Sequence, residues 1–281
     1  MMTSTFRIER HHVTLNFMHM NVKHLRILLL GLLVLGFLPS CYIDLDNDLC
    51  ERGQGSVIVE EIFVPSFDGI DLQTDARVTI RRGESQLVEV RGQQNIIDLL
   101  DRDVNQGIWD IRMFRCTRNS DQLEIFITVP EMTYVSLSGS GSISSESVFE
   151  GSVTDIILSG SGRIDFATNS NEIDLRVNGS GDIVLDVEGN SMDTDISGSG
   201  LVSVQGEVNE QQLRVSGSGD YRAFDLLSRE GDIRIQGSGS ARVYITEFLR
   251  ANITGSGDIR YRGNPSLDVS VSGSGRVINA N

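Results

Sequence analysis

The chain has 281 residues, including 29 glycines, and a formal net charge of −15 from 24 basic and 39 acidic residues. All four histidines and the only lysine, Lys23, lie within the first 24 residues. Beyond residue 40 the chain therefore offers no histidine base or metal ligand, no Ser-His or Cys-His pair and no Schiff-base lysine. The 20 basic and 38 acidic residues that follow residue 40 carry a net charge of −18, which also argues against binding of a nucleic acid backbone.

The N-terminal segment has the layout of a secretory signal peptide. Residues 27–38 form an apolar run that follows basic residues and is too short to span a bilayer comfortably. The run ends in Leu38-Pro39-Ser40-Cys41, which resembles a bacterial lipobox, where the lipidated cysteine becomes the first mature residue. We therefore predict a signal peptide over residues 1–40, with Met20 as an alternative start, and lipidation of Cys41. An uncleaved anchor or a buried apolar helix is the alternative.

Residues 41–54 are predicted to form an acidic tether between the lipid and the rest of the chain. Acidic residues that closely follow Cys41 resemble the surface-export signal of some lipoproteins, although a solvated tether explains them equally well. The predicted location is the cell envelope, as an outer-membrane lipoprotein that faces the periplasm or is exposed at the surface. There, Cys50 and Cys116 would lie in a compartment that permits a disulfide. Two free thiols, or one buried thiol, remain the alternatives.

The next region, residues 55–137, is strand-rich but irregular. We expect strands at residues 57–62, 87–90, 108–111 and 123–129, one helical turn or corner at residues 95–100, and Trp109 in the core. The segment Asp75–Ile80 looks like a degenerate copy of the motif Gly-Ser-Gly-Arg-Val-Ile found near the C-terminus. Ala76 precedes its equivalent, Gly141, by a distance that corresponds to about three coils of the repeat described next. We therefore extend one repeat architecture through this region, without a second domain.

Residues 138–281 contain the strongest signal, a repeated Gly-Ser-Gly motif. It occurs eight times at nearly even intervals, starting at Gly139, Gly160, Gly179, Gly198, Gly217, Gly237, Gly255 and Gly273. A period this steady is typical of a solenoid in which each repeat forms one coil. Apolar and polar residues alternate strictly on both sides of the motif, which indicates strands. The sequence thus predicts an all-β fold over residues 55–281: a single parallel β-helix with coils of about 19 residues and ten to twelve coils in total.

The alternation also assigns faces to the motif. If it continues unbroken, both glycines point inward at a tight corner and the serines point outward. The outward serines form a candidate binding-face ladder, which comprises Ser161, Ser180, Ser199, Ser218, Ser238 and Ser256. The alternative is that serine is simply the smallest polar residue compatible with the bend. In the row that follows each motif, Arg163 should stack on Asp182, and Asp258 on Arg276.

These features together resemble the head GIN domain family of auto-transporter adhesins. The resemblance rests on Phe67–Ile70, Ala76–Ile80, Gly83–Val90, Leu123–Pro130 and the Ser-Gly-Ser-Gly ladder, and it covers about residues 57–281. The family implies a right-handed β-helix and, through its name, adhesion. It supplies no set of catalytic residues.

Three functions remain open at this point. The leading one is a lipid-anchored, non-enzymatic module that presents a rigid face to glycan, matrix or a surface protein, with the membrane as its other partner. The second is a carboxylate enzyme acting on polysaccharide, since Asp182, Asp220 and Asp258 would lie about 9.6 Å apart on alternate coils, near the separation in inverting glycosidases. Against it, no long loop leaves the solenoid to build a cleft. The third is a purely structural envelope protein. We expect neither a cofactor nor a metal, because Gly-Ser-Gly-Asp does not follow the nine-residue period of calcium-binding β-helices.

Overall fold

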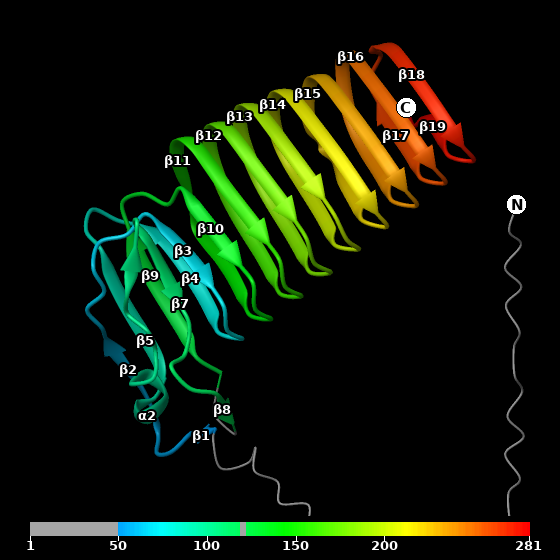
Figure 1. The fold of residues 1–281 in the computed structure, drawn as a ribbon. Helices are drawn as coiled ribbons and strands as arrows, with labels where there is room; N and C mark the ends of the chain where they lie inside the picture. Colours follow the sequence, from blue (N-terminus) through cyan, green and yellow to red (C-terminus); the bar gives the residue numbers. More distant parts are fainter. Residues whose placement is uncertain (1–49, 119–121) are drawn as a thin grey trace, which may run out of the picture. The chain divides into compact units, whose positions relative to one another are not determined.

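The chain winds into a parallel β-helix whose coils stack in register (Figure 1). The computed structural model describes residues 50–118 and 122–281, and these belong to one compact unit. The solenoid has about 8 turns with coils of about 19 residues, which confirms the predicted fold class; ten to twelve coils was too high an expectation. The predicted signal peptide and Cys41 lie outside the described residues.

The regular coils follow one another in sequence order (Figure 1). Each consists of a long bent strand that pairs in parallel with the strands before and after it. These strands are β11 (Ser142–Leu158), β12 (Arg163–Val177), β13 (Asp182–Ile196), β14 (Leu201–Gly217), β15 (Asp220–Gly237) and β16 (Ser240–Gly255). The register places Ile164 beside Ile183 and Ile183 beside Val202. All three side chains are buried, so equivalent apolar positions form continuous rows in the core.

The N-terminal coils do not follow sequence order. Strands β3 (Gly69–Leu72) and β4 (Arg77–Arg82) form a coil that pairs directly with β10 (Tyr134–Leu137) and with the start of β11. Ala76 and Gly141 therefore lie in adjacent coils, and the expectation that three coils separate them is wrong. On its other side the same coil pairs with β7 (Ile108–Ile111) and β9 (Glu124–Val129).

The segment between β4 and β10 folds back and covers this end of the stack. Strand β5 (Leu87–Gln93) pairs in antiparallel fashion with β9 and with β2 (Val57–Glu61). The short helix α2 (Gln94–Ile97) follows, and then β6 (Val104–Asn105), which is antiparallel to β7. Trp109 is fully buried, as expected, and its indole N–H donates a hydrogen bond of 2.9 Å to the carbonyl of Asp101. An antiparallel layer thus protects strand edges that a bare solenoid would leave unpaired.

The other end of the stack is formed by β17 (Asp258–Arg262), β18 (Ser266–Gly273) and β19 (Arg276–Asn279). Leu249 on β16 is fully buried, whereas its neighbour in register on β18, Leu267, is 47% exposed. Within the described chain, no strand pairs with the outer side of β18. A search of the described residues for a helix long and apolar enough to cross a membrane finds none.

Candidate binding face

The Gly-Ser-Gly motifs form a corner at which successive coils leave no room for a side chain. A Cβ added at Gly237 would lie 2.5 Å from the carbonyl oxygen of Gly217, one coil before. A Cβ at Gly200 would meet both Cγ1 of Val177, at 2.8 Å, and the carbonyl oxygen of Gly181, at 2.9 Å. The second glycine of each motif is buried, but the first is only half-buried or exposed. The expectation that both glycines face inward is therefore right for the second alone.

The serines between the glycines form a straight exposed row along the stack. The ladder residues Ser161, Ser180, Ser199, Ser218, Ser238 and Ser256 are all exposed. From the second member on, the backbone N–H of each donates to the carbonyl of the first glycine of the preceding motif, as in Ser218 to Gly198 at 3.0 Å. Among the described residues, only Ser256 uses its side chain, in a hydroxyl contact of 3.1 Å with Ser274. The remaining hydroxyls of the ladder are thus available to a ligand.

A second polar row runs beside the ladder, one position before the first glycine of each motif. All its members are exposed: Ser138, Ser159, Asn178, Ser197, Ser216, Gln236, Thr254 and Ser272. One hydrogen bond links neighbouring coils in this row, from the hydroxyl of Ser197 to Oδ1 of Asn178 at 2.6 Å. The two rows together make the corner a strip of small polar groups on a rigid backbone.

The row that follows each motif contains the two ion pairs expected between coils. Arg163 lies 3.9 Å from Asp182, and Arg276 lies 3.1 Å from Asp258. A hydrogen bond from Arg276, outweighing burial, lowers the pKa of Asp258. Burial alone would raise the pKa of Asp220, but hydrogen bonds from Ser240 and from an arginine side chain lower it overall. A glycosidase acid needs a raised pKa, so this row does not favour the enzyme hypothesis.

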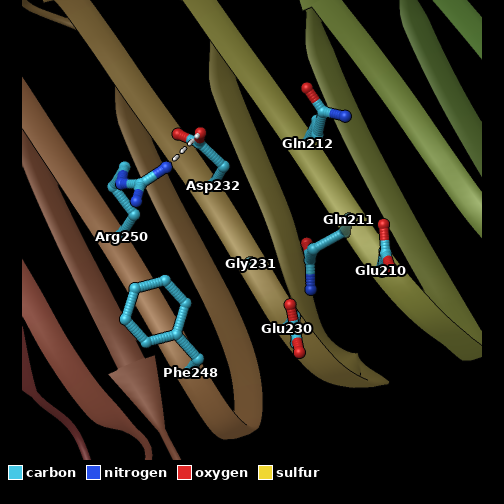
Figure 2. A pocket seen from close by; sticks show the side chains of 8 residues that line it. All are labelled: Glu210, Gln211, Gln212, Glu230, Gly231, Asp232, Phe248 and Arg250. Carbon is cyan, nitrogen blue, oxygen red and sulfur yellow. Dashed lines mark ion pairs between the residues drawn. The ribbon is translucent and has the colours of Figure 1, made fainter.

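Acidic side chains gather on the sheet that precedes the corner. A depression of about 190 Å³ there is lined by Glu210, Glu230, Asp232 and Arg250, among others, and it is open to solvent (Figure 2). Arg250 forms an ion pair of 3.7 Å with Asp232 across it. A larger depression, of about 440 Å³, lies in the N-terminal region near Phe63. In the part of the chain that the structure describes, no group of His, Cys, Asp and Glu is arranged to hold a metal ion.

One acidic residue of this sheet, Asp174, has a raised pKa. Burial is the main cause, and the negative charge of Asp155 adds to it. The two residues are neighbours in register on adjacent coils, and Asp193 follows on the next. Arg176 lies 3.3 Å from Asp155 and 3.9 Å from Asp174, and it offsets part of the repulsion between them.

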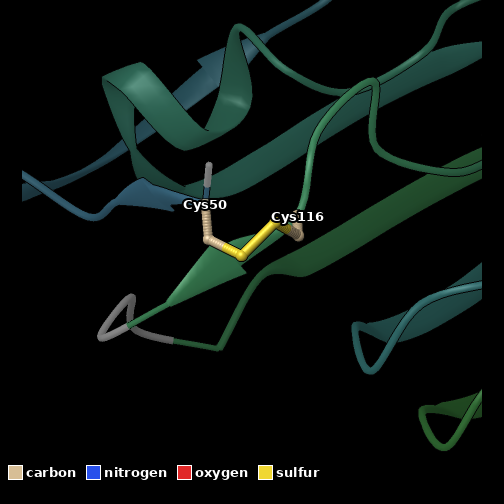
Figure 3. The surroundings of a disulfide bond; sticks show 2 residues. All are labelled: Cys50 and Cys116. Atoms are coloured by element: carbon tan, nitrogen blue, oxygen red, sulfur yellow. A yellow bond between two sulfur atoms is a disulfide. The ribbon is translucent and has the colours of Figure 1, made fainter. Parts of the chain in front are cut away.

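Cys50 and Cys116 are joined by a disulfide, whereas the sequence alone leaves free thiols open as well (Figure 3). The bridge closes a separation of 66 residues. Directly after each cysteine, β1 (Glu51–Arg52) pairs in parallel with β8 (Thr117–Arg118). The side chain of Asn95 accepts from the N–H of Gln54 and donates to the carbonyl of Arg52. The start of the described chain is therefore fastened to the N-terminal end of the solenoid.

The sequence interpretation missed a row of arginines next to the ladder. Arg222, Arg242 and Arg260 lie side by side on β15, β16 and β17. A signal for them exists, because three consecutive motifs read Gly-Ser-Gly-x-x-Arg. The ion pairs expected from the sequence involve only the position directly after the motif, two residues before these arginines.

The stacked coils and the polar corner define a β-solenoid protein. A family model described as "Putative auto-transporter adhesin, head GIN domain" matches residues 66–265, and the chain belongs to this family. The resemblance identified in the sequence is thereby confirmed. A comparison with curated proteins gives no match.

Solved structures share the fold over most of the chain. A protein from Parabacteroides distasonis named as a putative lipid binding protein is 26% identical, with a TM-score of 0.77 over 82% of this chain and 99% of that one. Proteins named as putative adhesins come from the same organism (23% identity, TM-score 0.78, 82% and 99% covered) and from Parabacteroides merdae (21%, 0.80, 83% and 100%). The names of the family and of these neighbours are "putative" adhesin or lipid binding protein, and none of these names is that of an enzyme.

Proposed function

We propose that this chain is a cell-envelope binding protein, anchored by a lipid on Cys41 to the outer membrane, whose polar corner contacts glycan, matrix or a surface protein. The observation that carries the proposal is the exposed serine ladder on a rigid backbone, with its hydroxyls largely unused inside the protein. A rigid face is favourable for binding because little conformational entropy is lost on contact. The family's description supports adhesion as the class of activity.

The binding part of the proposal is tested by adding charge to the ladder. The full chain in detergent micelles is applied to a panel of glycans and matrix proteins, and the triple variant Ser180→Glu, Ser199→Glu and Ser218→Glu is compared with it. We expect the variant to lose at least tenfold in affinity for any ligand found.

A matched control places the same three charges elsewhere on the same coils. Asn171, Asn190 and Asn209 are exposed on β12, β13 and β14, and Asn209 donates to Asn190 in register. The variant Asn171→Glu, Asn190→Glu and Asn209→Glu should keep wild-type affinity. Equal losses in the two variants, or no ligand across the whole panel, would contradict the proposal.

The anchor is tested separately in cells. Cys41→Ala removes the thiol that lipidation requires, so the variant should move from the membrane fraction to the soluble fraction. Cys41 lies outside the described residues, and the prediction rests on the sequence alone. A variant that has lost its signal peptide and still remains in the membrane fraction would refute the lipoprotein assignment.

A further inference from the structure

The regular stacking of the coils is interrupted around β15 on the sheet that follows the corner, and a separate register shift lies between β11 and β12. The register between β14 and β15 shifts between Ser203 and Gln205, and that between β15 and β16 shifts between Ala223 and Leu227. Bulges of this kind redirect side chains and occur frequently beside functional sites. Here the bulge coincides with a depression of about 300 Å³, lined by Arg222, Phe224 and Arg242 among others.

Two members of the arginine row, Arg222 and Arg242, line this depression, and the third, Arg260, lies next to Arg242 in register. Arg222 is followed in register by Arg242 and then by Arg260, so that successive guanidinium groups emerge from strands about 4.8 Å apart. Like charges directly opposite each other in a sheet are destabilising. A row of three arginines is therefore not what folding alone favours.

The arginines outnumber the carboxylates around them. The last coils of this sheet carry five arginines, namely Arg222, Arg242, Arg260, Arg262 and Arg276. The same coils of the sheet carry three carboxylates, those of Asp220, Asp225 and Asp258. This local excess of positive charge stands out in a chain whose net charge is −15. A local excess of positive charge in a depression attracts anions.

The acidic neighbours leave most of the guanidinium donors unused. Each guanidinium carries five N–H donors. Arg222 donates through Nε to Asp220 at 2.7 Å, and Arg260 donates through one terminal nitrogen to Asp258 at 3.0 Å. Arg242 lies 3.6 Å from Asp220 without a hydrogen bond. The side chain of Arg262 makes no hydrogen bond to the described residues and instead lies over the ring of Phe224, 4.2 Å from its centroid.

We propose that this arginine patch, made of Arg222, Arg242, Arg260, Arg262 and Phe224, binds an acidic polysaccharide that runs along the stack. The inference rests on the proposed binding function and names its ligand class. A polyuronate carries carboxylates at regular intervals along its chain, so a chain running along the stack can present carboxylates to several of the arginines. Guanidinium groups bind carboxylates in a bidentate manner, and the serine ladder on the neighbouring corner supplies hydroxyl partners for the sugar hydroxyls.

A second copy of the chain is the main rival as occupant, since its acidic sheet also presents carboxylates at the coil spacing. Those carboxylates already have partners: Asp155 lies 3.3 Å from Arg176, and Asp193 lies 3.1 Å from Arg214. Two chains of strongly negative net charge also repel each other. The ion pairs within the acidic sheet and the repulsion between two negative chains both favour a polysaccharide over a second copy as the ligand.

The test measures binding of oligogalacturonate, with a neutral galactan oligomer of equal length as the comparison probe. The full chain in detergent micelles is titrated by calorimetry. We expect oligogalacturonate to bind, with an affinity that falls as salt rises, and the neutral oligomer to bind at least tenfold more weakly. The triple variant Arg222→Gln, Arg242→Gln and Arg260→Gln should lose at least tenfold in affinity for oligogalacturonate.

A control removes the same charge from the acidic sheet. The control is the triple variant Arg176→Gln, Arg214→Gln and Arg234→Gln, whose positions lie on β12, β14 and β15. This variant should bind oligogalacturonate as well as the wild type does. The single variant Arg242→Gln, whose side chain makes no hydrogen bond in the described chain, keeps the test valid if the triple variant fails to fold; it should lose affinity by several-fold. Equal effects of the two triple variants would overturn the inference.

Further outcomes separate this inference from the proposed function. If the protein binds neutral glycans or a matrix protein but not oligogalacturonate, the acidic-polysaccharide inference fails and the binding function stands. If it binds nothing on either panel, both fail. Self-association that depends on the arginine row, measured by sedimentation without added glycan, would assign the patch to a second copy and would also overturn the inference.

Discussion

Replacing Gly237 by alanine should destabilise the β-helix far more than any substitution of the serine beside it. Gly237 has a φ of +124°, a backbone conformation that residues with a Cβ rarely adopt. Strain of this kind costs about 1–3 kcal/mol. The new Cβ would also lie 2.5 Å from the carbonyl oxygen of Gly217, and overpacking of this order adds about 1–3 kcal/mol.

The two costs are partly offset in the unfolded chain. Alanine has fewer unfolded conformations than glycine, which returns about 0.4–1 kcal/mol. The net loss should therefore be about 1–6 kcal/mol for Gly237→Ala. The neighbouring Ser238 is exposed and uses only its backbone N–H, which alanine retains, so Ser238→Ala should change stability by less than about 0.5 kcal/mol.

Urea unfolding followed by circular dichroism measures both variants under identical conditions. Solenoids unfold partly coil by coil, so the midpoint of the transition is compared, with hydrogen exchange at β15 and β16 as a local measure. A Gly237→Ala midpoint equal to that of Ser238→Ala would refute the steric account of the glycine corner. The glycines would then reflect only small size and not a forbidden contact.

Three further predictions concern the N-terminal region and the acidic sheet. Replacing Cys50 and Cys116 by alanine should lower stability by up to about 4 kcal/mol, the loop-closure value for a separation of 66 residues, and reduction of the wild type should reproduce the shift in urea midpoint. Asp174→Asn should stabilise the protein at neutral pH. Because the pKa of Asp174 is raised in the folded state, the free energy of unfolding of the wild type falls as the pH rises above 3.8. Below that pH the free energies of unfolding of the variant and the wild type should converge. For Asp101 the sign is opposite. Burial raises its pKa, but hydrogen bonds from the N–H of Asp103 and from Arg112 lower it overall, so Asp101→Asn should cost about 1.5–3 kcal/mol at neutral pH. That deficit should shrink as the pH falls below 3.8, and a deficit independent of pH would contradict the assignment.

The regular coils could be predicted from sequence because a solenoid repeats both its pattern and its neighbours. Each apolar position meets the equivalent position one period away, so the expected stacking of Arg163 on Asp182 required only the period. The N-terminal coils have no such guide. Ala76 meets Gly141, far along the sequence, because the intervening chain folds back to cap the stack, and antiparallel pairing of β5 with β9 leaves no periodic trace.

The interior also contains features that alternation alone does not reveal. Gln211 occupies an inward position of β14 and is fully buried. Its amide nitrogen donates to Ser228 at 2.7 Å, and its amide oxygen accepts from the buried hydroxyl of Tyr221 at 3.3 Å. Such a polar cluster is stable only because each group finds a partner from another coil. The sequence shows three polar residues, but their separations along the chain do not match the period.

The arginine row illustrates what the period could reveal and what it could not. That Arg222, Arg242 and Arg260 are neighbours follows from their identical place after three successive motifs. That Arg222 and Arg242 line a depression does not follow, because the depression coincides with a register shift within β15. The motifs at the two ends of β15 are farther apart in sequence than those at the two ends of β16, so the sequence shows that the coil of β15 contains extra residues. The length of the coil does not show on which sheet these extra residues lie. In a solenoid, therefore, the composition of a surface row can be predicted from sequence, whereas its shape requires the positions of the bulges.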